Sequence, residues 1–290
     1  MTFRTRLWAK VGEQARRDAV TLFSTMPLSQ PSPRVGLASM RDAWGMDDEG
    51  VNIVHQLPYS MRGAKNHATL GLVGLLFKLF PNNERLTRWN RETASEQLVD
   101  IFNGKHRPVL WPDWHSDAGW ARTFVQGPCA GDLRAEGDIW VVDARVLASC
   151  ECKPGLVPLG VMVALTIDEQ GPRPAWIQLQ DGRRVTPADG GDWEHARLVA
   201  AAAMQNYVSM LRHVLNLHYI AGQALAVLVH NGLPWQHPLH RLLFPHAAGT
   251  LTANWMANVV FMREKTLAQS TYSFTWQGIQ SLVREGLAAS

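Results

Sequence analysis

The chain has 290 residues and a formal net charge of +3, with 46% of its residues hydrophobic and 18% charged. This composition is typical of a globular protein with a large core, and so small and scattered a charge excludes a nucleic-acid-binding surface. Because the sequence contains no internal repeat and no linker, we expect a single domain over residues 1–290.

The cysteines and the N-terminus bear on the compartment. Cys129, Cys150 and Cys152 do not make a disulfide framework, and the Cys-Glu-Cys spacing lacks the two-residue spacer of a zinc knuckle. Residues 1–20 have the pattern of a basic amphipathic helix without the apolar stretch of a secretory signal. The apolar run at residues 68–80 is too short to span a bilayer. We therefore expect a cytoplasmic protein with free thiols and no integral membrane insertion.

The first half of the chain predicts helices and loops. Residues 1–60 predict an N-terminal helix followed by a Pro/Ser-rich loop. Residues 61–105 predict two helices, at about 66–80 and 93–102, and residues 106–137 predict an irregular, Trp-rich loop. Residues 138–180 hold three β-branched runs bounded by Gly, Pro and Asp, which predict a small antiparallel sheet.

A long helix dominates the second half. The pattern is helical without a break from Asp192, a good N-cap, to about Val229, and Asn231-Gly232 with Pro234 ends it. At 1.5 Å per residue this helix would be roughly 55 Å long, and a helix that is apolar on most faces is the centre of a core. Two more helices are expected near residues 253–268 and 276–287. The predicted fold is mainly α-helical, built around one long buried central helix (192–230), with a small antiparallel β-sheet (138–180).

The histidines of this helix are the most informative residues. His213 and His218 are five positions apart, which places them about 140° apart around a regular α-helix, on different faces. A π-bulge, with its i→i+5 hydrogen bonds, would bring residues five apart nearly into line, and Gly222 makes such an irregularity plausible. The alternative is that both are core histidines bonded to backbone carbonyls.

The segment of residues 193–246 resembles the lipoxygenase catalytic domain. The family's motifs are matched in order by Trp193, Ala196-Arg197, His213, His218 and the stretch LPWQHPLHRLLFPH at residues 233–246. Upstream, IWVVDARVL and PLGVMVALTIDEQGPRPAWIQLQ are similar to the family's strand pair, and downstream TLTANWMANVV is similar to the segment after its Pro-His. The resemblance covers about residues 110–275 and implies the lipoxygenase fold.

The resemblance also implies where the family's non-haem iron would lie. The first ligand position falls on Val208 or Ser209, depending on the end from which it is counted, and neither is an expected iron ligand. His213 matches the second ligand, and His218 matches a histidine that does not bind iron in the family. The later ligands would come from beyond Ser290. Since one imidazole does not hold Fe(II) against water, we expect a truncated, divergent lipoxygenase-like domain without stoichiometric iron and without another cofactor.

The resemblance assigns structural roles to the histidines after the helix. His237 and His246 are expected to tie a loop to the central helix, with Pro238 and Pro245 fixing the backbone around them. His240 is expected to be exposed.

The first functional hypothesis is an enzyme that keeps the apolar cavity and acts on a long apolar substrate, of the polyene or fatty-acyl type, in a biosynthetic pathway. Its chemistry would be metal-independent, such as isomerisation or cyclisation. His213, at the wall of an elongated apolar pocket, would act as acid and base, with Tyr207, Ser209 and His218 as neighbouring catalytic candidates.

Two other hypotheses remain open. One is an iron-dependent dioxygenase whose missing ligands come from a homodimer, from a partner chain, or from other positions such as His115, Glu151 or Cys152. The other is a non-catalytic relative that binds lipid or scaffolds a partner. If truncation leaves an apolar face open, a homodimer or a partner chain is expected to cover it.

Overall fold

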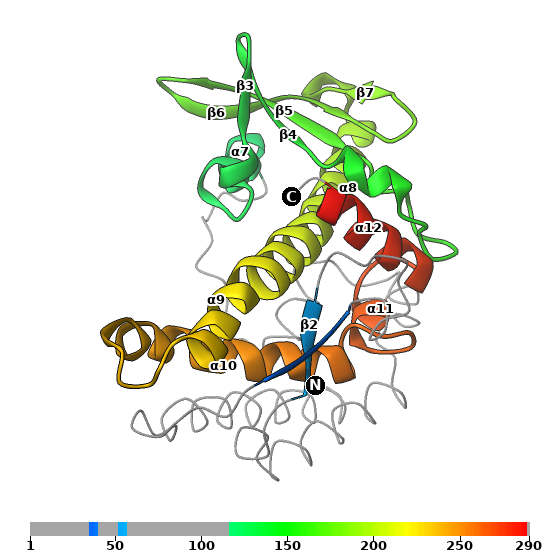
Figure 1. The fold of residues 1–290 in the computed structure, drawn as a ribbon. Coiled ribbons are helices and arrows are strands. Elements are labelled where there is room, and N and C mark those ends of the chain that lie inside the picture. The colour runs from blue at the N-terminus through cyan, green and yellow to red at the C-terminus, as the bar shows by residue number, and fades with distance from the viewer. Residues whose placement is uncertain (1–34, 40–51, 57–115, 289–290) are drawn as a thin grey trace, which may run out of the picture. The chain divides into compact units, whose positions relative to one another are not determined.

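The computed structural model describes residues 35–39, 52–56 and 116–288 (Figure 1). The helices predicted near the N-terminus, at 66–80 and at 93–102 lie outside these residues. The chain divides into two compact units, one of Met1–Arg107 with Leu215–Tyr272 and one of Pro108–Val214 with Ser273–Ser290. The single domain expected over the whole chain stays a prediction.

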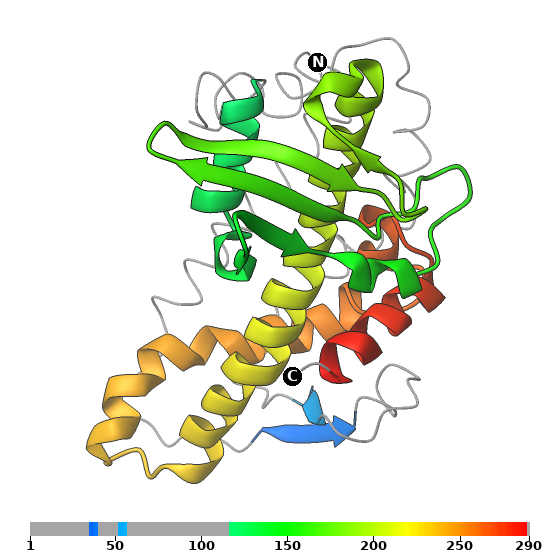
Figure 2. The ribbon, with the colours of Figure 1, turned by 90° about the horizontal axis from the view of Figure 1, so that it is seen from above.

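The unit of Pro108–Val214 with Ser273–Ser290 carries a five-stranded antiparallel sheet whose strands follow one another in chain order. Its long strands are β4 (Ile139–Asp143), β5 (Met162–Asp168) and β6 (Gly171–Gln178), which are the green neighbours in Figure 2. They confirm the predicted sheet. The short edge strands β3 (Arg134–Glu136) and β7 (Arg184–Val185) were not predicted. Buried side chains hold the sheet in place, among them Val141, Met162 and Ala164.

Two helices, α7 (Asp117–Gln126) and α12 (Trp276–Ala288), belong to the same unit as this sheet. α7 falls where a loop was predicted, and that prediction is wrong. Its N-cap is Ser116, whose hydroxyl accepts a hydrogen bond from the backbone N–H of Gly119. α12 confirms the last predicted helix. It packs so closely on residue 151 that a Cβ at Gly278 would lie 2.3 Å from the Glu151 carbonyl oxygen.

The predicted long helix is continuous. It consists of α8 (Gly191–Tyr207), the π-helical segment η4 (Val208–Gly222), α9 (Gln223–Val227) and a second π-helical segment η5 (Leu228–Gly232). It ends at Gly232, as predicted. Its N-cap is Gly190, so the prediction of Asp192 as the cap is wrong, and Asp192 instead accepts a hydrogen bond from Arg183 in the first turn. The helix is buried along part of its surface and exposes several leucines elsewhere.

The unit of Met1–Arg107 with Leu215–Tyr272 places α10 (Pro238–Val260) against α9 and strand β2. The sequence predicted a loop up to residue 246 and a helix at about 253–268, and both boundaries are wrong. A short separate helix, α11 (Leu267–Thr271), follows. Strands β1 (Gly36–Ser39) and β2 (Asn52–Gln56) form an antiparallel pair within residues 1–60, where only helix and loop were predicted.

Local chemistry explains why α10 begins so early. Pro238 stands at the first helical position, where its missing N–H and fixed φ are tolerated. His237 is the N-cap, and its Nδ1 accepts a hydrogen bond of 3.1 Å from the backbone N–H of Leu239. Pro245 lies inside the helix. The expectation that His240 is exposed is wrong, since it is 3% exposed and its ring stacks on Phe244 at a centroid distance of 5.2 Å.

All three cysteines are free, and burial raises the pKa of the Cys129 and Cys150 thiols to about 11. Within the described parts of the chain, no helix has the length and apolarity needed to cross a membrane.

Candidate functional site

The candidate residues lie on or beside the π-helical segment η4. The sequence analysis gave such a π-helical irregularity as one way to align His213 with His218. In a π-helix residue i bonds to residue i+5, so residues five apart follow one another along the same side. Val208, His213 and His218 are related in this way. The segment requires the glycine at its end, because a Cβ at Gly222 would lie 2.5 Å from the Leu217 carbonyl oxygen. His213 is exposed, and Val208 and His218 are half-buried.

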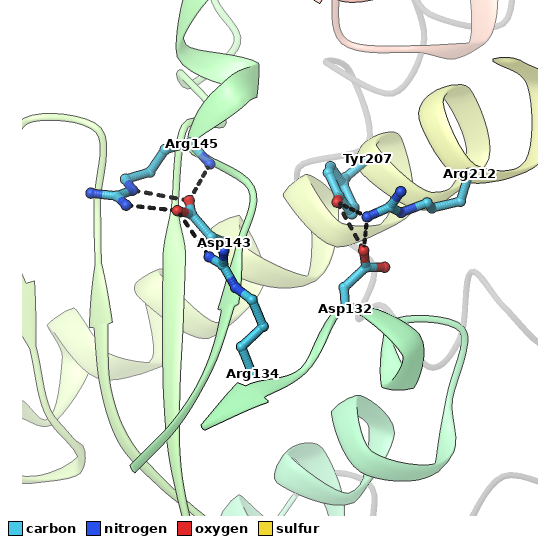
Figure 3. Close-up of polar contacts among 6 residues, drawn as sticks. All are labelled: Asp132, Arg134, Asp143, Arg145, Tyr207 and Arg212. Atoms are coloured by element: carbon cyan, nitrogen blue, oxygen red, sulfur yellow. Dashed lines mark hydrogen bonds and ion pairs between the residues drawn. The ribbon is translucent and has the colours of Figure 1, made fainter. Parts of the chain in front are cut away.

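Tyr207, just before η4, is part of a charged cluster (Figure 3). Its hydroxyl donates a hydrogen bond of 3.0 Å to Asp132 and accepts one of 2.9 Å from Arg212. Arg212 also forms an ion pair with Asp132, whose side chain is 7% exposed. Burial, reinforced by the Asp132 carboxylate, raises the pKa of Tyr207 to about 12. The phenol therefore stays protonated at neutral pH and ties residue 132 to the helix.

The remaining candidates make separate contacts. The Ser209 hydroxyl accepts a hydrogen bond of 2.9 Å from the Gln205 side-chain amide, one turn earlier. His218 Nδ1 lies 2.9 Å from Asn254 Oδ1, while Asn254 Nδ2 donates to the His218 carbonyl at 2.7 Å. Because that amide nitrogen faces the carbonyl, its oxygen faces the ring, and Nδ1 of His218 carries the hydrogen. The described contacts do not join Tyr207, Ser209 and His218 into one catalytic group.

The bond to Asn254 belongs to a buried amide network that the sequence analysis missed. Gln223 Oε1 accepts from Asn254 at 3.4 Å and from the backbone N–H of Val54 at 3.1 Å. Asn258 Nδ2 donates to the Val54 carbonyl at 2.6 Å, and Asn258 Oδ1 accepts from the Tyr219 hydroxyl at 2.9 Å. These side chains therefore bond both polar backbone groups of one strand residue, as a neighbouring strand would. Buried amides in apolar helices were the signal that could have found them.

The motif residues at the start of the long helix have a structural role. The Trp193 indole N–H donates to Asp117 Oδ1 at 2.8 Å, and Arg197 forms ion pairs with Asp117 at 3.3 Å and with Glu194 at 3.2 Å. Trp193 and Arg197 are buried, and Ala196 is fully buried between them. These contacts join α8 to α7.

The side chains described here do not fit the metal of the lipoxygenase fold. Among residues 35–39, 52–56 and 116–288, no group of three or more His, Cys, Asp or Glu side chains could hold a metal ion. Neither residue that the resemblance matches to the first-ligand position, Val208 or Ser209, is an expected iron ligand. Of the other positions considered, His115 lies outside the described residues, the Glu151 carboxylate accepts from the Thr275 hydroxyl at 2.6 Å, and the Cys152 thiol donates to the Val157 carbonyl at 3.6 Å.

Comparison with solved structures defines the class of fold. A manganese lipoxygenase structure superposes with a TM-score of 0.63 and 9% identity, over 92% of this chain and 53% of that one. The fold is therefore lipoxygenase-like, mainly helical with a small antiparallel sheet.

Comparison with curated sequences points the same way, although no family model matches the chain. The hydroperoxide isomerase ALOXE3 of Homo sapiens is 30% identical over 183 residues, which are 56% of this chain and 24% of that protein. The manganese lipoxygenase of Pleurotus sapidus is 22% identical over 244 residues, 62% of this chain and 38% of that protein. The chain thus spans less than half the length of these relatives. It is a divergent lipoxygenase-like protein.

Proposed function

We propose that this chain is a lipoxygenase-like enzyme that rearranges a long apolar substrate, such as a polyene or fatty-acyl chain made in a biosynthetic pathway, without the metal chemistry of lipoxygenases. The reaction would be an isomerisation or a cyclisation, so the product would keep every atom of the substrate. The observation that carries this proposal is the composition of η4. It has the π-helical geometry that aligns residues 208, 213 and 218, but the resemblance puts the first metal ligand at Val208 or Ser209, and neither is an expected iron ligand.

One relative is named as a hydroperoxide isomerase, and an isomerisation neither adds nor removes atoms. This relative therefore supports a rearrangement as the reaction class. His213 is the candidate that could exchange protons with a substrate, because its side chain is exposed on η4. An imidazole can take a proton from one position of the substrate and return it at another. Tyr207, Ser209 and His218 would hold the backbone around His213 through the contacts described above.

The product mass tests this proposal. We expect the purified chain, incubated with linoleic acid or with its hydroperoxide, to give a product of unchanged mass without oxygen uptake, in the presence of a metal chelator. A product that has gained two oxygen atoms, with oxygen consumed and activity abolished by the chelator, would instead establish the iron-dependent dioxygenase. Binding of both compounds without any product would establish a non-catalytic lipid-binding protein.

A further inference from the structure

A helical hairpin ends in an exposed apolar tip. The long helix stops at Gly232, a short turn follows, and α10 starts at Pro238, as the yellow and orange ribbons show in Figures 1 and 2. Five large apolar side chains around this turn are exposed, and we call them the hairpin tip: Leu225 (40%), Leu228 (55%), Trp235 (37%), Leu239 (50%) and Leu242 (63%).

These side chains are not the inner surface of the hairpin. The two helices already bury a separate set of residues against each other, which includes Ala226, Val229, Phe244 and Ala247. The tip therefore adds a second apolar surface on the outside of a packed pair. Full burial of one leucine is worth about 1.5–3 kcal/mol, and contiguous exposed apolar groups mark interaction sites.

The charge around the tip selects the partner. Residues 213–262, which include the hairpin tip, contain no aspartate, glutamate or lysine, and Arg241 is their one arginine. Arg241 is exposed between Leu239 and Leu242, and His237 and His246 are exposed beside them. A surface that complements the tip must be apolar in depth and anionic at its edge.

We propose that the hairpin tip docks on an anionic lipid surface. Leucine side chains would enter the boundary of the acyl chains, Trp235 would lie at the level of the headgroups, and Arg241 would meet anionic headgroups. A second copy of the chain fits less well, because a two-fold contact through this surface would bring two copies of Arg241 together, and residues 213–262 offer no carboxylate to pair with them. This inference does not depend on the proposed reaction, although a lipid surface is also where a long apolar substrate would be found.

Vesicle sedimentation of the full chain tests the proposal. We expect it to sediment with vesicles of phosphatidylcholine containing about 30% phosphatidylglycerol, and far less with phosphatidylcholine alone, because anionic headgroups attract basic residues near the surface. Binding should weaken at high salt, which screens exposed charges. Failure to sediment with the anionic vesicles would overturn the proposal. Equal binding to both kinds of vesicle would overturn its electrostatic part, and with it the stated partner.

Matched variants locate the surface. Leu239→Ser with Leu242→Ser should lower the vesicle partition coefficient at least tenfold, since both side chains lose the gain from burial. Arg241→Gln should lower it about fivefold on anionic vesicles, as expected for one basic residue near such a surface. Leu198→Ser, at a leucine 68% exposed on α8 and outside the tip, should leave it unchanged. Circular dichroism confirms that each variant folds. An equal loss in the Leu198 variant, unchanged binding of the tip variants, or a tip-dependent dimer in solution would each contradict the proposal.

Discussion

Replacing His213 by alanine is expected to lower turnover of the polyene substrate about 100-fold or more, because positioned acid–base groups contribute roughly that much to rate. The same change should leave the protein folded, because the side chain is exposed and most single substitutions cost about 0.5–3 kcal/mol or less. Steady-state kinetics and denaturant unfolding measure the two effects. Normal turnover in a folded His213→Ala variant would show that the residue is structural and that the chemistry occurs elsewhere.

His218→Ala is the matched control on the same side of η4. It removes the ring that faces Asn254 and leaves that buried amide oxygen without its partner, which costs about 1–3 kcal/mol of stability. Where the variant remains folded, we expect it to keep most of its turnover. A loss of turnover only in the His213 variant would show that the position of the family's second metal ligand has become the catalytic one.

The protein should lose stability as the pH falls from about 7 to 4, and one histidine should contribute about 3 kcal/mol of that loss. His230 is 5% exposed, and both of its ring nitrogens are buried without a hydrogen-bond partner. Its ring packs on Phe244 at 5.2 Å, among apolar side chains, and His240 is the titratable neighbour that acts on it. Burial, with a smaller effect of His240, lowers the pKa of His230 from 6.5 to about 4.

The sign of the effect follows from this lowered pKa. The unfolded chain takes up a proton on His230 below about pH 6.5, whereas the folded chain takes it up only near pH 4. The unfolded state therefore binds more protons between these values, and acid favours unfolding. The contribution of His230 is complete above about pH 6.5 and is lost as the pH falls through the window to 4.

The variant His230→Leu should remove this dependence. It should also raise stability near neutral pH by about 1–3 kcal/mol, because two unpaired polar atoms leave the core. His246→Gln, at an exposed histidine of α10, should leave the pH dependence as in the wild type. Unfolding by urea at several pH values between 4 and 8 measures both effects. A His230→Leu protein that is less stable at neutral pH, or that keeps the full acid loss, would contradict this account.

The parts of the fold that could be predicted from the sequence are those encoded locally. β-branched runs between turn residues specified the three long strands, and Asn231-Gly232 with Pro234 specified the end of the long helix. Gly222 indicated an irregular helix, and the π-helical segment confirms that prediction. Glycine is needed at this position because a side chain there would collide with the Leu217 carbonyl.

The errors have physical causes of two kinds. In two places a local helix signal was present but was misinterpreted. Ser116 and Gly127 flank α7, yet the stretch between them was predicted to be an irregular loop. Pro238 was predicted to lie in a loop, although proline suits the first position of a helix. The burial of His240 followed from that error, since only a helix places its ring on Phe244. Other features pair residues far apart in the chain.

The amide network is of this second kind. The bond between Gln223 and Val54 joins residues 169 positions apart, and the bond between Asn258 and Val54 joins residues 204 apart. A local pattern can show that a buried amide needs a partner, but it cannot name the partner. The four candidate catalytic residues were chosen by their nearness in sequence, and the structure gives Tyr207, Ser209 and His218 different hydrogen-bond partners.

The metal content of the purified protein tests most directly the claim that this lipoxygenase-like chain works without the family's metal. The chain should be expressed with iron and manganese supplied, desalted without chelator and analysed for both elements, alongside His213→Ala. We predict far less than stoichiometric iron and manganese in both proteins, with turnover of the wild type unchanged by chelation. A stoichiometric metal ion in the wild type that is lost in His213→Ala would contradict the account.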